Sequence, residues 1–126
     1  MANLGSIAAK LWQSLFPCWT VTGDSTANAA KTITKAAVTG SRHYITGYLV
    51  SVTGAAVGTA DIAIELQDDT TTVWKDVLGA AAARGQRAGV VFAHPIELTV
   101  SKAANLVVAA GGASVITFCN MTGFTY

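Results

Sequence analysis

The sequence contains unusually few charged residues. Asp, Glu, Lys and Arg make up 12% of its 126 residues, whereas an ordinary soluble domain has about 25%. Hydrophobic residues make up 52%, and the mean hydropathy is +0.46. Obligate protein interfaces are depleted in charge, and large apolar patches are rarely left in water. We therefore expect much of the surface to be buried against other chains, and we predict a homo-oligomer.

A long apolar run and a large net charge are also missing. No continuous stretch of about 20 apolar residues occurs, so the apolar excess does not predict a membrane span. The net charge is +1, and only Arg84 and Arg87 stand close together among the basic residues. A solvated loop or a salt bridge to a neighbouring subunit would explain this pair. Because no basic groove accompanies Trp12, Trp19 and Trp74, we expect packing or interface anchors rather than a nucleic-acid platform.

The sequence has two cysteines, Cys18 and Cys119. Two cysteines do not make a disulfide framework, although nothing in the sequence excludes their proximity. Both stand in apolar surroundings, where a thiol behaves as a small buried hydrophobe. We expect both to be reduced and buried.

Histidine and thiol chemistry has no recognisable motif. His43 and His94 are isolated and lack the spacing of a metal-binding pair. A thiol–imidazole pair of Cys119 and His94 would be a nucleophile, but nothing in the sequence places them together. We predict no enzyme activity, no metal site and no cofactor.

The acidic residues allow one alternative. Glu65, Asp68 and Asp69 could offer oxygen ligands to Ca²⁺. Their spacing does not fit an EF-hand loop, and aspartate is common in turns for local reasons. We expect a turn here rather than a cation site.

The sequence is rich in short strand patterns. About eight are separated by turn residues at the spacing of a sandwich or barrel, and one domain of this length can bury a core. We predict an all-β antiparallel β-sandwich in jelly-roll order, with an immunoglobulin-like sandwich as the alternative. The predicted strands lie within residues 18–22, 31–38, 43–52, 61–66, 71–77, 90–93, 96–101, 105–109 and 114–119.

Two of these segments carry the clearest patterns. Ile62, Ile64 and Leu66 alternate with polar or small residues and predict a buried face, with Trp74 at least partly buried on the returning strand of a hairpin. The segment 43–52 is apolar on both faces: Tyr44, Tyr48, Val50 and Val52 on one, and Ile45 and Leu49 on the other. Gly47 in its middle indicates a bulge or a close approach.

Residues 1–17 are predicted to form a separate arm, and residues 18–126 the β-sandwich domain. Apolar residues in the arm recur at helical spacing, and Pro17 ends the pattern. A signal peptide is disfavoured because there is no basic n-region and Lys10 interrupts the apolar part. A helix of about 12 residues is marginal alone, so it packs on its own domain or on another chain. The candidate interface residues are Leu4, Ile7, Leu11, Trp12, Leu15 and Phe16.

Five segments between residues 42 and 126 follow one another in an order that is typical of a known class of proteins. They are Tyr44-Ile-Thr-Gly-Tyr-Leu-Val, Ile62-Ala-Ile-Glu-Leu-Gln-Asp, Val73-Trp-Lys-Asp, Phe92-Ala-His-Pro-Ile-Glu-Leu and Asn105-Leu-Val-Val-Ala-Ala-Gly-Gly. In this order the chain resembles small structural proteins of tailed-bacteriophage virions.

The resemblance implies a function that the residues alone do not give. Such proteins include capsid decoration (cement) proteins, often trimers at local three-fold points of the shell, and some tail or fibre modules. It implies a non-enzymatic homotrimer on the outer surface of the phage capsid, with the major capsid protein as its partner. The alternative is a tail, fibre or adaptor module that binds a receptor or glycan.

Overall fold

The computed structural model describes residues 17–126, which form eight β-strands and no helix. No helix in this range could span a membrane. The predicted helical arm lies outside the described residues. The strands are β1 (Cys18–Asp24), β2 (Lys31–Lys35), β3 (His43–Val52), β4 (Ile62–Asp68), β5 (Thr71–Leu78), β6 (Arg87–Glu97), β7 (Ala104–Val108) and β8 (Thr117–Thr125).

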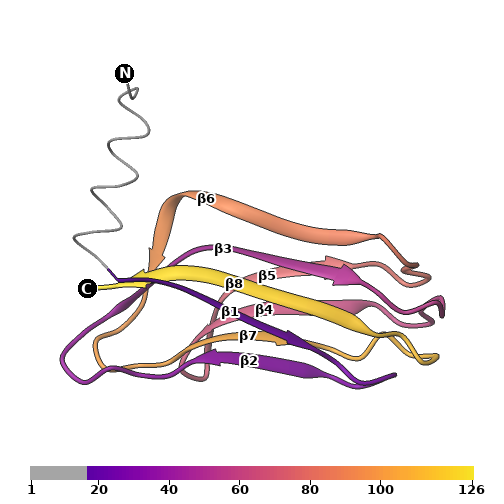
Figure 1. Ribbon diagram of the computed structural model, residues 1–126, viewed down its shortest axis with the longest axis horizontal. Helices are drawn as coiled ribbons and strands as arrows, with labels where there is room; N and C mark the ends of the chain where they lie inside the picture. Colours follow the sequence, from indigo (N-terminus) through magenta and orange to yellow (C-terminus); the bar gives the residue numbers. More distant parts are fainter. Residues whose placement is uncertain (1–16) are drawn as a thin grey trace.

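The strands form two four-stranded antiparallel sheets that pack face to face (Figure 1). Sheet A has the order β1-β8-β3-β6, and sheet B has the order β2-β7-β4-β5. Strands pair in a nested way: β1 with β8, β2 with β7, β3 with β6 and β4 with β5. The predicted all-β sandwich is confirmed. The immunoglobulin-like alternative is wrong, because there the first two strands share a sheet, whereas β1 and β2 lie in different sheets.

The core lies between the two sheets and follows the alternation of the sequence. Ile62, Ile64 and Leu66 of β4 are completely buried, as the pattern predicts. Trp74 pairs with Leu66 across the β4–β5 hairpin and is 38% exposed, so it is partly buried. Asp69 adopts a positive φ of 57° in the turn, a conformation that aspartate tolerates better than most residues.

A bulge in β3 changes which side chains face the core. The register with both neighbouring strands shifts between Ile45 and Gly47, so the phase of the alternation changes there. Ile45 is therefore buried together with Tyr48, and the prediction that these two lie on opposite faces is wrong. Tyr44 points to the outer face of sheet A, where its ring stacks on that of Phe124 at 4.8 Å.

The predicted bulge or close approach at Gly47 is confirmed. A Cβ at this position would lie 2.7 Å from the carbonyl oxygen of Val90, which is closer than any real contact of this kind. Glycine therefore lets β3 and β6 approach at the point where the register shifts.

Most strand boundaries differ from the prediction by a few residues, and the largest differences are at β6 and β8. Strand β6 begins at Arg87 and runs through Pro95 to Glu97, so the predicted strands 90–93 and 96–101 are one strand, and residues 98–101 lie in the loop after it. Pro95 is tolerated because β6 is an edge strand, where a missing N–H leaves no ladder bond unmade. Strand β8 begins at Thr117 rather than at Ser114 and continues to Thr125.

The cysteines occupy different environments. Cys119 is buried in the core as expected, but Cys18 is exposed, so the prediction is wrong for Cys18. Cys18 lies opposite Phe124 and Cys119 lies opposite Gly23, which puts them five residues apart along the strand pair. That is about 16 Å at the rise of a strand, well beyond the span of a disulfide.

Candidate interaction surfaces

The predicted arm residues Leu4, Ile7, Leu11, Trp12, Leu15 and Phe16 lie outside the described residues. The structure does place the point where the arm joins the domain. The N–H of Thr125 donates to the carbonyl of Pro17 at 3.1 Å, so the chain enters β1 beside the end of β8. The arm residues therefore stay a prediction, with a defined point of attachment.

The structure does not bring Cys119 and His94, the residues of the thiol–imidazole alternative, together. Cys119 is fully buried on the inner face of β8, and burial raises the pKa of its thiol. His94 is exposed on β6, which is separated from β8 by β3. A protonated thiol inside a core is a packing group and not a nucleophile.

The three acidic residues considered for Ca²⁺ are held by other side chains. Glu65 accepts hydrogen bonds from Thr72 at 3.0 Å and Gln67 at 3.2 Å and pairs with Lys75 at 3.4 Å. These contacts, the Thr72 hydroxyl first, lower the pKa of Glu65. Residues 17–126 contain no group of three side chains that could hold a metal ion.

Asp68 and Asp69 tie the hairpin turn to the chain after β6. Asp68 accepts from the backbone and hydroxyl of Thr99 at 3.0 and 2.6 Å, and Asp69 pairs with Lys102 at 3.4 Å. Their role is structural, as the turn interpretation predicts.

Two side-chain networks were not predicted from the sequence. His43 is buried, and its Nε2–H donates to the carbonyl of Ala36 at 2.8 Å. Its Nδ1 then accepts from the hydroxyl of Thr125 at 2.8 Å, and Trp19 donates to the same hydroxyl at 3.1 Å. Only the alternation of His43 with Ile45 could have signalled its burial.

The second network joins the two sheets. The hydroxyl of Tyr48 in sheet A donates to Asp76 in sheet B at 2.5 Å and accepts from the indole of Trp74 at 3.2 Å. Phe92 packs edge-on against Trp74 at 5.1 Å. Burial, and after it the bond to Asp76, raises the pKa of Tyr48 to about 12. This network closes the side of the sandwich where β5 and β6 are the edge strands.

The two ends of the sandwich differ in charge. One end, here called the loop end, consists of residues 25–30, 53–61, 79–86 and 109–116 and is rich in alanine and glycine. Its charged residues are Asp61, which accepts from the N–H of Ala80 at 2.7 Å, and Arg84, which donates to the carbonyl of Thr53 at 3.1 Å. The opposite end carries the ion pairs Arg42–Glu97 and Lys102–Asp69.

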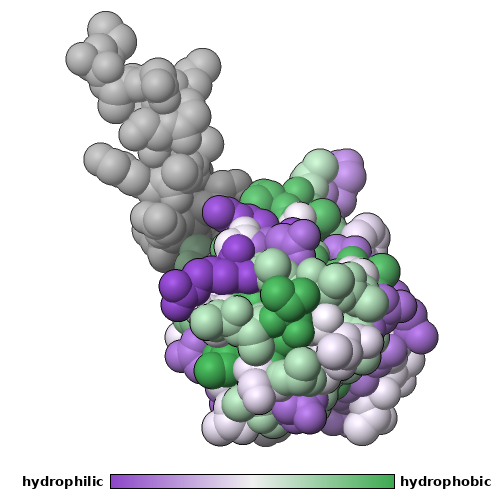
Figure 2. All heavy atoms as spheres, turned by 90° about the vertical axis from the view of Figure 1, so that its right-hand side faces the viewer, coloured by the Kyte–Doolittle hydropathy of each residue, from purple (hydrophilic) through white to green (hydrophobic). Residues whose placement is uncertain are grey.

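The loop end is therefore apolar over its centre, with hydrophilic side chains toward its sides (Figure 2). Val57 is 51% exposed there. A surface of small uncharged residues costs little to remove from water, so the loop end suits burial against another protein.

Backbone hydrogen bonds hold these loops together. The N–H of Thr59 and that of Ala60 donate to the carbonyl of Gly111, at 2.9 and 3.0 Å. The N–H of Gly58 donates to Ala82 at 2.9 Å, and the N–H of Asn28 donates to Val115 at 2.9 Å. The loop end is thus ordered before it meets a partner, and an ordered surface loses less conformational entropy on binding.

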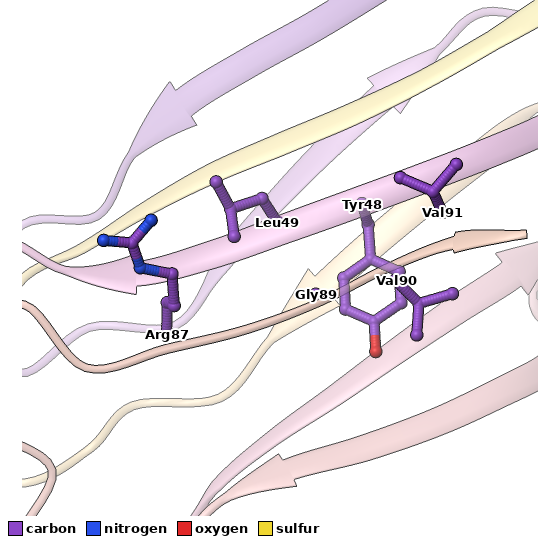
Figure 3. A pocket seen from close by; sticks show the side chains of 6 residues that line it. All are labelled: Tyr48, Leu49, Arg87, Gly89, Val90 and Val91. Carbon is purple, nitrogen blue, oxygen red and sulfur yellow. The ribbon is translucent and has the colours of Figure 1, made fainter.

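A shallow hollow of about 390 Å³ lies beside strand β6. Leu49, Arg87 and Val91 project from one side of sheet A around this hollow, while Tyr48 and Val90 point to the other side (Figure 3). The hollow is open and mostly apolar, and no nucleophile or acid–base pair lines it. It has the chemistry of a packing surface and not of an active site.

Comparison with solved structures shows the fold in other proteins. The chain is similar to a chain of the acidic stable capsid of Helicobacter pylori bacteriophage KHP30, with a TM-score of 0.55, 15% identity, and 85% and 86% of the two chains covered. It is also similar to a chain of Bacillus endospore appendages, a family of disulfide-linked pili, with a TM-score of 0.50, 18% identity, and 87% and 88% covered. No protein-family model and no curated protein matches the sequence.

Proposed function

We propose that the protein is a non-enzymatic virion structural protein that decorates and stabilises a phage capsid as a homo-oligomer, with a trimer as the expected state. The observation that carries this proposal is the ordered, charge-poor loop end on a β-sandwich of a kind also found in a phage capsid. Such a surface suits permanent burial in an assembly. The expected location is the outer surface of the capsid, bound to the major capsid protein.

The strand order supports the jelly-roll assignment. A jelly roll is an eight-stranded double sheet built from two Greek keys. The nested pairing from β1 with β8 down to β4 with β5 is that of one long hairpin wound into two sheets. We therefore propose that the domain is a jelly roll.

Binding to capsids and position on the particle test the function. The protein is incubated with undecorated capsids, co-sedimented and located in a particle map. Density spread over the shell at local three-fold points supports decoration, and density confined to the tail supports the alternative module. Failure to co-sediment with capsids or virions contradicts both.

The loop end provides a sharper test. Val57→Glu places a carboxylate on the loop end, where burial would leave the charge unpaired. The control is Val38→Glu, which changes a valine of similar exposure, 43% against 51%, in the loop before β3. If the loop end is the buried surface, only Val57→Glu weakens co-sedimentation. Equal binding of both variants would point to another face.

The second candidate is a tail, fibre or adaptor module. The similarity to a pilus chain supports it, because pili are filaments of repeating subunits. Under this alternative the purified protein forms filaments or binds glycans and does not cover the shell.

A further inference from the structure

Strand β6 lies at the edge of sheet A with a neighbour, β3, on one side only (Figure 1). An open strand edge presents unpaired backbone groups to other chains, and proteins usually protect it with charged side chains, proline or bulges. The edge strands of sheet B have this protection: Lys31 and Lys35 in β2, and Lys75 in β5. Strand β6 has no charged residue between Arg87 and Glu97. Its proline, Pro95, and its irregular pairing with β3 come after Val91, so residues 88–91 have none of these protections.

The register of β6 fixes which backbone groups face outward. The N–H of Val52 donates to the carbonyl of Gln86 at 2.9 Å, so Gln86 is turned toward β3. Antiparallel partners alternate between hydrogen-bonded and non-hydrogen-bonded pairs. The regular pairing continues to Val91, so Gly89 and Val91 direct their N–H and C=O groups to the open side.

On the outer face of sheet A, the side chain of Val91 protrudes, and a hollow lies beside Gly89. Val91 is 90% exposed, the highest value among the large apolar side chains of residues 17–126. Two positions earlier, Gly89 has no side chain, and a Cβ there would lie 3.0 Å from Leu49 Cδ1. The space above Gly89 is part of the hollow between Leu49, Arg87 and Val91 (Figure 3).

We infer that β6 pairs with β6 of a second copy of this chain, antiparallel and about a two-fold axis through Val90. In this register Gly89 of each copy lies opposite Val91 of the other. Both residues have outward N–H and C=O groups, so the two pairs form four backbone hydrogen bonds. Each exposed valine comes beside the glycine of the other strand, and the two Arg87 residues lie on opposite sides of the axis, so no like charges meet. A surface that fits itself in this way is what a two-fold contact requires.

The same contact lies beside the side of the sandwich where β5 and β6 are the edge strands. Trp74 of β5, which is 38% exposed, contacts Phe92 of β6 there. Large aromatic side chains at the centre of an interface contribute most to its affinity. The pairing therefore buries apolar area in addition to forming hydrogen bonds.

This inference does not depend on a role in the virion. The trimers proposed above would form through another surface and pair through β6 into a dimer of trimers in solution, and copies that do not trimerise become dimers. An even number of subunits is the common expectation.

The first test measures the native mass of the full chain and of two variants at micromolar concentration. Val91→Lys places two ammonium groups close to the axis and changes a side chain that makes little contact with its own domain. The control, Val77→Lys, changes a valine that is 54% exposed on β5. We expect an even-numbered wild-type assembly whose mass is halved by Val91→Lys and unchanged by Val77→Lys. A monomeric or odd-numbered wild type, or a Val91→Lys variant with wild-type mass, overturns the inference.

The second test fixes the register. Facing residues of a non-hydrogen-bonded pair have Cα atoms about 4.5 Å apart, within the range of a disulfide. Val90→Cys in a Cys18→Ser background should form a covalent dimer on mild oxidation, whereas Val77→Cys in the same background should not. Absence of the Val90→Cys dimer overturns the proposed register. Capsid co-sedimentation is measured separately, so its loss without a change in mass concerns the proposed function and leaves this contact standing.

Discussion

At the scale of single residues, burial follows the alternating pattern, but the polar contacts do not. Ile62 and Ile64 are completely buried, as a period-2 pattern requires. The hydrogen bond between Tyr48 and Asp76 joins residues of different sheets, and no local pattern relates them. Burial of His43 likewise depends on partners at Ala36 and Thr125 that only the fold brings near.

The first residue-scale prediction concerns the core. Ile64→Ala removes a side chain with no exposed surface, and such changes cost about 2–5 kcal/mol because a cavity remains. We expect a lower midpoint of urea unfolding for this variant. Val77→Ala, at an exposed position, should leave the midpoint nearly unchanged. An unaffected Ile64→Ala midpoint would show that β4 does not face the core.

The second residue-scale prediction concerns alkaline pH. Burial and the hydrogen bond to Asp76 raise the pKa of Tyr48 to about 12. Because the folded state disfavours the ionised phenol, the stability from this group is complete below pH of about 10, the ordinary tyrosine pKa. It is lost as the pH rises through the pKa of the folded protein.

Chemical denaturation across this pH window tests the point. Tyr48→Phe should have a lower free energy of unfolding at neutral pH, by about 1–3 kcal/mol, because Asp76 and Trp74 lose a partner. Its stability should also fall less steeply in alkali than that of the wild type. Tyr126→Phe, at a position 71% exposed, is the control and should follow the wild type. Parallel curves for wild type and Tyr48→Phe would contradict the assigned coupling.

At the scale of strands and loops, the sequence predicts which strands form better than it predicts where each strand begins and ends. The β4–β5 hairpin is correct because alternation, turn residues and a returning apolar strand agree. The prediction of two separate strands at residues 90–93 and 96–101 is wrong because β6 continues through Pro95. An edge strand tolerates proline, and edge position depends on the order of strands in the sheet. The phase of β3 is wrong after Ile45 because one extra residue in a bulge moves later side chains to the other face.

A prediction at this scale concerns that bulge. Gly47→Ala would place a Cβ 2.7 Å from the carbonyl oxygen of Val90, so β3 and β6 must separate locally. We expect destabilisation of about 1–3 kcal/mol, the usual cost of overpacking, measured by urea unfolding. Gly79→Ala is the matched control, because a Cβ there meets nothing within 4 Å. Equal stability of the two variants would mean that the strands can move apart freely.

At the scale of the whole molecule, composition predicts an interacting protein but not its surfaces. Low charge and high mean hydropathy indicate that the surface of the folded protein keeps apolar area that the core does not bury. The collection of four separate loops into one charge-poor end follows from the nested strand order, which pairwise patterns do not specify. The position of β6 at an open edge of sheet A also follows from the strand order.

The last prediction concerns the arm. Residues 1–16 precede Pro17, whose carbonyl accepts a hydrogen bond from Thr125, and within residues 17–126 the buried core cluster is formed by residues from Ile33 to Met121. If the arm docks on another chain, deleting residues 1–16 should leave the β-sandwich folded by circular dichroism. The predicted apolar face includes Trp12 and Phe16, and burial of one such side chain contributes about 1.5–3 kcal/mol.

If that face docks on another chain, the tether raises its effective concentration, and many copies on one shell multiply the gain. The truncated protein should then co-sediment more weakly with undecorated capsids while keeping its unfolding midpoint. A Trp12→Ala, Phe16→Ala double variant of the full chain should show the same loss if the apolar face, rather than chain length, is responsible. Full-strength binding by the truncated protein would refute a role for the arm in attachment. Loss of folding would show instead that the arm packs on its own domain, the alternative that the sequence leaves open.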